Sequence, residues 1–248
     1  MEYITTFHFI DKYLPKKGTV LDAGSGPGRY AIELAKRGYK VTLFDLAPEN
    51  LEFARKKLQR LHLPGRASNF VEGSVEDLSA FPRGSFDAVL CLGGPLSHLM
   101  NVKERKKAVS ELVRVAKVDA PIVVSVINKF PMLLYELRGE HGLRDPVGRR
   151  IFRRILKSGD YFGESLFTAF HGFMPEELRE LFSIPSVRIL EMAGLEGLAA
   201  NNGADLNALA KRKSLWNMWL EAHYATCTHP AVQAFSAHEL LVAKKTKG

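Results

Sequence analysis

Apolar runs and helix-like patterns alternate along the first 128 residues of the chain. Five short apolar runs predict buried strands at 18–24, 40–46, 67–74, 86–94 and 120–128. Between them, the spacing of apolar residues predicts helices at 29–39, 47–62 and 102–118. Continuous apolar strands separated by helices predict a parallel sheet that is covered on both faces, and therefore a doubly wound α/β domain.

The pattern changes after residue 128. Residues 130–158 predict mostly helical, basic material, and 160–173 an extended segment rich in aromatic residues. Further helices and strands alternate at 174–183, 186–197, 204–226 and 237–245. The sequence shows no repeat, low-complexity tract or Gly/Ser/Pro-rich linker. These features predict one domain over residues 1–248.

Composition agrees with an ordinary soluble protein that has a substantial core, since 46% of the 248 residues are apolar and 25% are charged. No apolar run reaches the roughly 18 residues of a membrane span, and the N-terminal segment has no cleavage-type signal. Cys91 and Cys227 lie far apart without a C-x-x-C motif. We therefore expect a cytoplasmic protein with neither a disulfide framework nor a metal site.

The net charge of +8 leaves two interpretations open. Basic residues concentrate at 103–109 and 144–157. Such runs are typical either of a solvated helix face or of a patch that binds anions or RNA.

The stretch TVLDAGSGPGRY, residues 19–30, contains the most distinctive chemistry. Gly24, Gly26 and Gly28 follow a predicted strand that carries Asp22 near its end. Glycines permit unusual dihedrals and a close approach of backbone to ligand, and the next helix offers free amides at its positive end. The G-x-G-x-G spacing differs from the dinucleotide pattern G-x-G-x-x-G. A purely structural turn is the alternative.

Two further features favour a nucleoside ligand. Asp45 ends the second predicted strand, where a carboxylate accepts hydrogen bonds from both hydroxyls of a ribose; capping of the following helix is the alternative. Ser74 and the amide of Val75, after the third strand, stand beside the expected adenine position.

With these motifs, the chain resembles the class I S-adenosylmethionine-dependent methyltransferases. The resemblance covers residues 1–128 and rests on LDAGSGPG, FDLAPENLEFAR, VEGSVEDLSAFPRGSFDAVLCLGG and VSELVRVAKVDAPIVVSV. It implies a Rossmann-like, mostly parallel seven-stranded sheet whose last strand, AHELLVAKK, inserts antiparallel. It also implies S-adenosylmethionine as cofactor, S-adenosylhomocysteine as product, and residues 1–128 as the cofactor-binding core.

The resemblance also implies cofactor contacts. The glycine loop would lie against the methionine part, Asp45 on the ribose and the third-strand loop on the adenine. The residues carried over are Asp22, Gly24, Ser25, Gly26, Gly28, Asp45, Leu46, Ser74, Val75 and Cys91. Many family members have Asp where this chain has Ser74, so Glu76 or Asp77 is the alternative source of an acid at the adenine.

The loop CLGGPLSHL, residues 91–99, differs from the Asn/Asp-Pro-Pro-Tyr/Phe type and is more similar to that of small-molecule methyltransferases. His98 is its titratable side chain and the candidate to take a proton from an acceptor; a packing histidine is the alternative. We expect residues 130–170 and 196–230 to form a helical cap that encloses an apolar pocket, with Trp216 or Trp219 in the cap.

Four further residues are candidates for contacts around the site. His171 and His223 are candidate acceptor contacts, although a structural role is the simpler interpretation, and Tyr3 and Phe7 are candidates to cover the cofactor. The leading hypothesis is a small-molecule methyltransferase. One alternative is an RNA methyltransferase that uses arginines at 149, 150, 153 and 154. A cofactor-binding protein without transfer activity is the third hypothesis.

Overall fold

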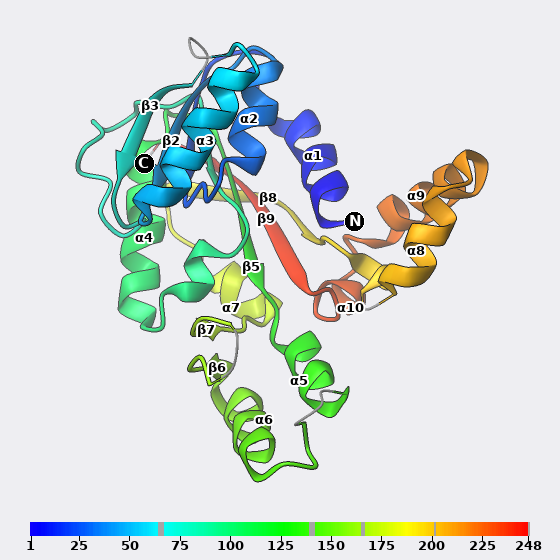
Figure 1. The fold of residues 1–248 in the computed structure, drawn as a ribbon. Helices are drawn as coiled ribbons and strands as arrows, with labels where there is room; N and C mark the ends of the chain where they lie inside the picture. Colours follow the sequence, from blue (N-terminus) through cyan, green and yellow to red (C-terminus); the bar gives the residue numbers. More distant parts are fainter. Residues whose placement is uncertain (64–66, 139–141, 165–166, 201, 248) are drawn as a thin grey trace.

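The computed structural model describes residues 1–63, 67–138, 142–164, 167–200 and 202–247. At its centre lies a seven-stranded sheet with the order β3-β2-β1-β4-β5-β9-β8 (Figure 1). Its strands are β1 (Thr19–Ala23), β2 (Lys40–Asp45), β3 (Ala67–Glu72), β4 (Ala88–Cys91), β5 (Pro121–Ile127), β8 (Val187–Gly194) and β9 (His238–Lys245). Strands β1 to β5 pair in parallel, and β9 lies antiparallel between β5 and β8. The predicted doubly wound sheet and its antiparallel insertion are confirmed.

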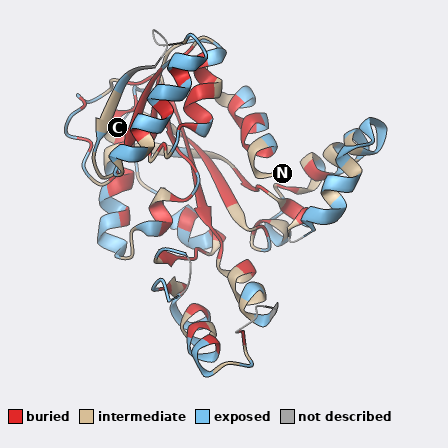
Figure 2. Ribbon diagram, in the orientation of Figure 1, coloured by how far each residue is buried: buried red, intermediate tan, exposed pale blue. Residues whose placement is uncertain are grey.

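Helices cover both faces of this sheet because successive residues of each strand point to opposite sides. They are α1 (Glu2–Tyr13), α2 (Arg29–Lys36), α3 (Pro48–Arg60), α4 (Val102–Val115) and α7 (Pro175–Leu181). Val20 and Val123 join the core under α1, α2 and α3, whereas Leu21 and Val124 join the core under α4 and α7. In Figure 2 the strands are accordingly the most continuously buried part of the molecule.

The strand order reverses between β1 and β4. From β1 the chain continues to β2 and β3 on one side of the sheet, and β4 and β5 lie on the other. The carboxyl ends of β1 and β4 therefore mark the switch point of the strand order, which is where open α/β sheets bind ligands. The glycine-rich loop, residues 24–28, leaves β1 at this point.

Two insertions also leave this edge of the sheet. The first contains α5 (Lys129–Arg138), α6 (Pro146–Ser158), β6 (Asp160–Tyr161) and β7 (Phe170–His171); the second contains η2 (Gly197–Ala199), α8 (Gly203–Ala210), α9 (Lys213–Thr226) and α10 (Pro230–Gln233). Because β8 and β5 both run antiparallel to β9, they point the same way and both insertions begin at the carboxyl edge. Figure 1 shows α5 and α6 below the sheet and α8 and α9 projecting to the side.

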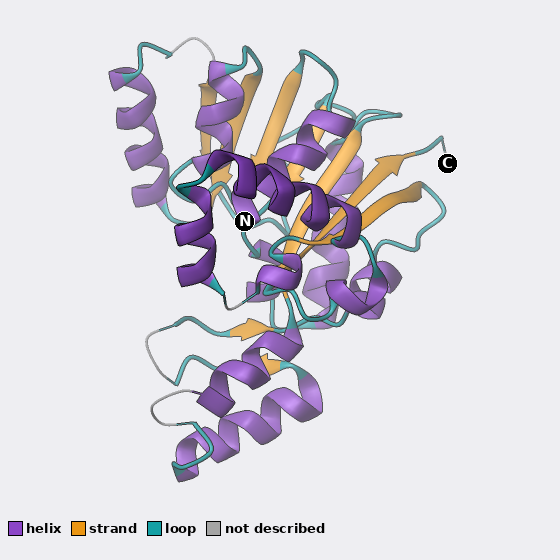
Figure 3. Cartoon of the chain, turned by 90° about the vertical axis from the view of Figure 1, so that its right-hand side faces the viewer, coloured by secondary structure: helices purple, strands orange, loops and turns teal. Residues whose placement is uncertain are grey.

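The two insertions separate in space. In the side view of Figure 3 the pair α5–α6 and the short strands β6 and β7 stand together below the ends of the sheet strands. The helix α8 contains no buried residue.

No helix within the described ranges combines the length and apolar character that crossing a membrane requires.

Helix α1 was not predicted from the sequence. Its aromatic and β-branched residues are middling helix formers, and the helix is instead stabilised by packing. Tyr3 stacks on Tyr30 of α2 at 5.8 Å between ring centroids, and Glu2 accepts hydrogen bonds from Arg29 and Tyr30, both at 2.7 Å. The N-terminal helix thus lies against the start of α2, next to the glycine-rich loop.

We predict that Gly28→Ala destabilises the fold more than Gly84→Ala does. Both glycines have positive φ, +78° and +67°, which costs an alanine about 1–2 kcal/mol. A Cβ at Gly28 would lie 2.9 Å from Ala54 Cβ, whereas at Gly84 it would meet nothing within 4 Å. Overpacking should add about 1–3 kcal/mol at Gly28 alone. Urea unfolding measures both losses, and equal losses would show that the α2–α3 contact is not tight.

Candidate functional site

The glycine-rich loop is held against β2 by its own backbone. The amides of Gly24 and Ser25 both donate to the Phe44 carbonyl, at 2.7 and 3.0 Å, and the Gly28 amide donates to the Ser25 carbonyl at 3.0 Å. Gly24, Gly26 and Gly28 all have φ between +51° and +78°. Side chains are unfavourable in this left-handed region, so the turn needs glycine at each of these positions.

The three glycines face different surroundings. A Cβ at Gly24 would lie 2.4 Å from Pro95 Cγ, and one at Gly28 would crowd Ala54. A Cβ at Gly26 would meet nothing within 4 Å. Gly24 and Gly28 are therefore required by packing, whereas Gly26 faces open space that a ligand can approach closely.

Asp45 connects the end of β2 to this loop. Its Oδ2 accepts a hydrogen bond from the Gly26 amide at 2.6 Å, and its Oδ1 accepts from the Ala47 amide at 3.0 Å and from Asn50 at 3.1 Å. Ala47 is the N-cap residue of α3, so Asp45 supports the helix start and also faces the glycine-rich loop. The helix-capping interpretation of Asp45 thus describes a contact that it makes, and its role on the ribose stays a prediction.

Asp22 is a buried carboxyl group that lacks a matching donor. It is 1% exposed, and within the described ranges neither oxygen has a partner with hydrogen-bond geometry. Burial raises the pKa of Asp22 to about 7; the Ala31 amide offsets part of this rise and the negative charge of Asp45 adds to it. A buried, unpaired carboxyl group is costly to keep. A ligand group that donates a hydrogen bond or carries positive charge would reduce that cost.

The other predicted nucleoside contacts lie at the ends of β2 and β3. Leu46 is 71% exposed, which is unusual for a large apolar residue that follows a buried strand. Val75 is buried and Ser74 half-buried, while the Ser74 carbonyl accepts from the Asp77 amide at 2.8 Å. Asp77 is exposed and its carboxylate caps the Ser79 amide at 3.0 Å, so it closes its own turn. Glu76 instead has one buried oxygen without a partner among the described residues.

The loop after β4 lies between the glycine-rich loop and β5. Pro95 contacts the Gly24 position, and a Cβ at Gly94 would lie 3.3 Å from Ile127 Cγ1. Ser97 Oγ accepts the Ile127 amide hydrogen at 2.9 Å. Cys91, which ends β4, is fully buried in the core, so its thiol offers no surface to a ligand at this edge.

His98, in the short helix η1 (Pro95–His98), is exposed. Its Nδ1 lies 2.9 Å from the Ala169 carbonyl oxygen. Because a carbonyl only accepts, Nδ1 carries the hydrogen and Nε2 holds the lone pair of the neutral ring. The contact also attaches η1 to the segment that contains Phe167, whose ring centroid is 6.0 Å away.

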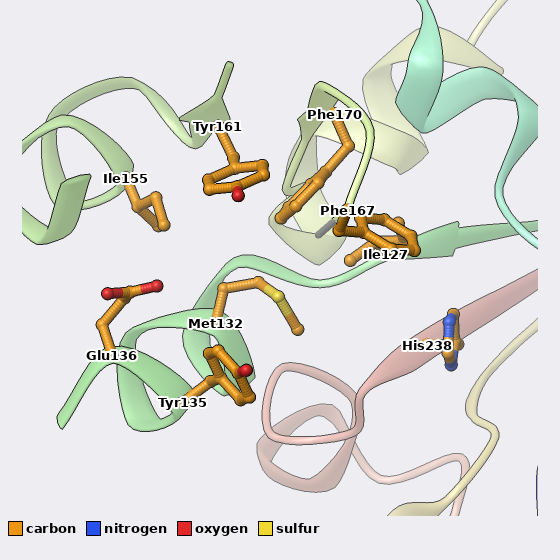
Figure 4. Close-up of a pocket in the computed structure, with 9 residues that line it drawn as sticks. All are labelled: Ile127, Met132, Tyr135, Glu136, Ile155, Tyr161, Phe167, Phe170 and His238. Carbon is orange, nitrogen blue, oxygen red and sulfur yellow. The ribbon is translucent and has the colours of Figure 1, made fainter. Parts of the chain in front are cut away.

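An apolar pocket of about 440 Å³ lies under the first insertion (Figure 4). It is lined by Ile127, Met132, Tyr135, Glu136, Ile155, Tyr161, Phe167, Phe170 and His238. Besides two tyrosines, this lining includes a carboxylic acid, Glu136, and a histidine, His238, which stand at opposite ends of the view in Figure 4. Burial raises the pKa of Glu136.

His238 and its partner Glu196 were not found by sequence analysis. His238 Nδ1 lies 2.8 Å from Glu196 Oε1, although 42 positions separate the two residues in the chain. His238 lies near the start of one predicted strand and Glu196 near the end of another. Nothing in the sequence near either residue indicates that their side chains meet.

The cap prediction is corrected in one respect. Neither tryptophan of α9 lines the apolar pocket; Trp219 instead lines a separate hollow with Asn202 and Leu206 of the second insertion. The reason is that α8 and α9 pack on each other and project away from α5 and α6. Among the residues that the structure describes, the pocket walls come from the first insertion together with Ile127 and His238 of the sheet.

The other two candidate histidines make internal contacts. His171 is 4% exposed and lies 2.8 Å from Asp160 and 3.3 Å from Glu177. His223 is 1% exposed, its Nε2 lies 2.8 Å from Thr5 Oγ1, and burial lowers its pKa to about 4. Both histidines connect secondary-structure elements and neither lines the pocket.

The basic run 144–157 forms the exposed face of α6, whose buried residues include Ile151 and Ile155. Arg154 pairs with Glu164 and lies over the Phe162 ring at 4.4 Å. Arg149 donates to the carbonyls of residues 143 and 144, while the arginines at 150 and 153 are exposed. The pattern describes an amphipathic helix with a solvated basic face.

Comparison with known proteins agrees with this geometry. Residues 20–119 match the family model described as a methyltransferase domain. A ubiquinone biosynthesis O-methyltransferase of Xanthomonas oryzae pv. oryzae is 36% identical over 112 residues, which cover 45% of this chain and 44% of that protein. A glycine/sarcosine/dimethylglycine N-methyltransferase of Actinopolyspora halophila is 30% identical over 122 residues, 48% of this chain and 21% of that protein. The chain thus matches less than half the length of these curated relatives.

Solved structures resemble the whole chain. A SAM-dependent methyltransferase from Methanosarcina mazei has a TM-score of 0.64 at 20% identity, covering 97% of this chain and 98% of its own. The Burkholderia thailandensis 1,6-didemethyltoxoflavin-N1-methyltransferase, solved with 1,6-didemethyltoxoflavin and S-adenosylhomocysteine, has a TM-score of 0.61 at 16% identity, covering 99% and 78%. At these identities the likeness shows the fold.

We predict that Asp22→Asn stabilises the free protein at pH 8 and leaves it unchanged near pH 4. The folded-state pKa of about 7 lies above the value of 3.8 for an unperturbed carboxyl. The ionised form therefore penalises the fold progressively between these pH values, by up to ~4 kcal/mol at about 1.4 kcal/mol per unit. Asparagine carries no such charge. Chemical unfolding at the two pH values measures the difference, and an equal effect at both would contradict a buried, titrating Asp22.

Proposed function

The chain carries a class I methyltransferase-like domain, and from this premise we propose that the protein binds S-adenosylmethionine and transfers its methyl group to a small-molecule acceptor. The observation that carries the proposal is the open space at Gly26, whose amide is bonded to the buried Asp45 carboxylate. A ligand bound at this position would contact the backbone of Gly26 and the carboxylate of Asp45 at the same time.

The residues present fit each part of this cofactor. Gly26 leaves room for the chain that carries the sulfonium, and the unpaired Asp22 carboxyl suits a positively charged group. Asp45 still has acceptor capacity on Oδ2 for a ribose hydroxyl, because a carboxylate oxygen has two lone pairs. Leu46 provides an exposed apolar surface and Val75 an amide for the base.

The acceptor belongs in the apolar pocket beneath the first insertion. Its wall residue Ile127 is packed against Gly94, and the adjoining Pro95 is packed against Gly24, so the pocket and the glycine-rich loop share one continuous set of contacts. A volume of about 440 Å³ suits a small molecule with a mainly apolar body.

The protein then needs to contribute little chemical activation of its own. S-adenosylmethionine supplies a methyl group already activated by its sulfonium. The chain's residues hold the acceptor in line with that methyl and exclude water, which is where most of the rate acceleration of such a reaction arises. Ile155, Tyr161 and Phe170 are buried beside the pocket and serve to exclude water.

Two alternatives make different predictions. An RNA methyltransferase should bind tRNA with a steep salt dependence through α6. A cofactor-binding protein without transfer activity should bind S-adenosylmethionine yet form no methylated product from any acceptor in a broad panel.

We predict that Asp45→Ala lowers the affinity for S-adenosylmethionine and S-adenosylhomocysteine about tenfold or more. A hydrogen bond to a charged group is worth roughly 1.5–3 kcal/mol. Calorimetric titration measures the loss, and NAD should show no comparable binding. Asn50→Ala is the matched control, because it removes one partner of Asp45 and leaves the carboxylate in place. Unchanged affinity in a folded Asp45→Ala variant would remove Asp45 from the site.

We also predict that Gly26→Ala weakens S-adenosylmethionine binding about tenfold or more. A tenfold loss of affinity corresponds to a steric cost of only about 1.4 kcal/mol. The added methyl group enters space that the ligand needs. Gly84→Ala has a similar positive φ and similar open surroundings, far from the loop in sequence, and should bind normally. If both variants bind as the wild type does, Gly26 serves the turn alone.

A further inference from the structure

His238 stands at the beginning of β9 and makes two hydrogen bonds to Glu196, which is itself held by a third from Ser236. Glu196 Oε1 lies 2.8 Å from His238 Nδ1. Glu196 Oε2 accepts from the His238 backbone amide and from Ser236 Oγ, each at 2.8 Å. A carboxylate with both oxygens engaged in this way has one orientation, and it fixes the imidazole ring as well.

This arrangement determines which ring nitrogen is available. The carboxylate only accepts, so Nδ1 carries a hydrogen and Nε2 holds the lone pair when the ring is neutral. No hydrogen-bond partner of Nε2 occurs among the described residues, and the His238 side chain remains 32% exposed. His238 lines the apolar pocket, in which Figure 4 shows its ring at one end.

The electrostatic surroundings strengthen His238 as a base. Burial alone would lower its pKa, but the hydrogen bond to Glu196 and the negative charges of Glu196 and Glu2 outweigh burial and raise it. Glu196 lies two residues beyond the end of β8, and Glu2 lies in α1. The neighbouring Glu239 is fully buried, and as the next residue of β9 its side chain points to the opposite face of the sheet. Ile127, the residue paired with His238 on β5, is uncharged.

His98 lacks these features. Its Nδ1 is held by a carbonyl group, which orients the ring but supplies no full negative charge to stabilise an imidazolium. Through Ala169 it fixes the segment that carries Phe167 into the pocket. His98 is therefore better suited to positioning the pocket wall, and the proton acceptor predicted there from sequence has a stronger counterpart in His238.

We propose that His238, oriented by Glu196, is the general base of the acceptor pocket, and that the acceptor carries a phenol-type hydroxyl on an apolar body. The inference rests on the proposed function of the site. As the acceptor oxygen forms its bond to the methyl carbon, the carbon–sulfur bond breaks with its electron pair remaining on sulfur, and the hydroxyl proton passes to His238 Nε2. A phenol gains from such a base because its own pKa is near 10, whereas a neutral amine already offers a lone pair.

The test variant is His238→Asn. The asparagine amide can still donate to Glu196, so the link between β8 and β9 is kept while the base at the Nε2 position is lost. His229→Asn is the matched control: this exposed histidine caps α10 by accepting the Ala231 amide hydrogen, a role that asparagine fulfils. Circular dichroism and thermal unfolding establish that both variants are folded.

The first readout needs no methyl donor. Titration of the protein with 4-nitrophenol at several pH values follows the visible absorbance of the phenolate. In the wild type the bound probe should ionise at lower pH than the free probe, because its proton moves to His238. The His238→Asn variant should lose this shift and His229→Asn should keep it. Failure of the wild type to bind phenols, or an equal shift in His238→Asn, overturns the proposal.

The second readout is the pH profile of methyl transfer to a phenolic acceptor. In the wild type kcat/KM should rise with pH as His238 loses its proton. In His238→Asn it should be lower by about 100-fold or more near neutral pH, and it should rise only where the phenol itself ionises. Glu196→Gln should move the wild-type inflection to lower pH. Unchanged profiles in both variants would assign the pair a purely structural role.

Calorimetry with S-adenosylmethionine on the same proteins separates the two hypotheses. Normal binding and turnover with an unaltered pH profile in His238→Asn would overturn the base and leave the proposed function intact. Absence of S-adenosylmethionine binding in the wild type would instead overturn the proposed function itself, whatever the phenol titration shows.

Discussion

The turn from β1 into α2 depends on two close approaches that a side chain would prevent. At Gly24 the backbone passes Pro95, and at Gly28 it passes Ala54 of α3. The Phe44 carbonyl, which accepts two amides of the loop, holds the same turn against β2. The loop is thus fixed on both sides, and Gly26 between them is left facing open space. The candidate cofactor site is this open space beside Gly26, which the packing contacts of the turn leave unfilled.

The same contacts extend from this turn to the pocket. Pro95 and Gly94 belong to the loop after β4, and Gly94 lies against Ile127 at the end of β5, which forms a wall of the pocket. Because β4 and β5 are neighbours in the sheet, their carboxyl ends bring the two halves of the site together. The antiparallel β9 completes the arrangement, since it places His238 at this edge opposite Ile127. The site therefore depends on strand order more than on any loop.

Identical side chains acquire different properties from their surroundings. Asp22 is buried without a matched donor and its pKa rises, whereas Asp45 accepts three hydrogen bonds on the neighbouring strand β2, two residues beyond the partner of Asp22. Burial lowers the pKa of His223, while the Glu196 carboxylate raises that of His238. Position in the fold, and not residue type, thus distinguishes a structural histidine from a candidate base.

The sequence by itself determined the α/β class, the strands of the sheet and the glycine turn, because these are encoded by short-range periodicity and by glycine spacing. It placed Asp45 at the end of β2 for the same reason. It did not identify α1, whose residues become helical by packing on α2, and it did not separate the second insertion from the pocket. Only the tertiary structure paired His238 with Glu196, since their contact arises from the register of β8 and β9 across 42 residues, and no local pattern records such a register.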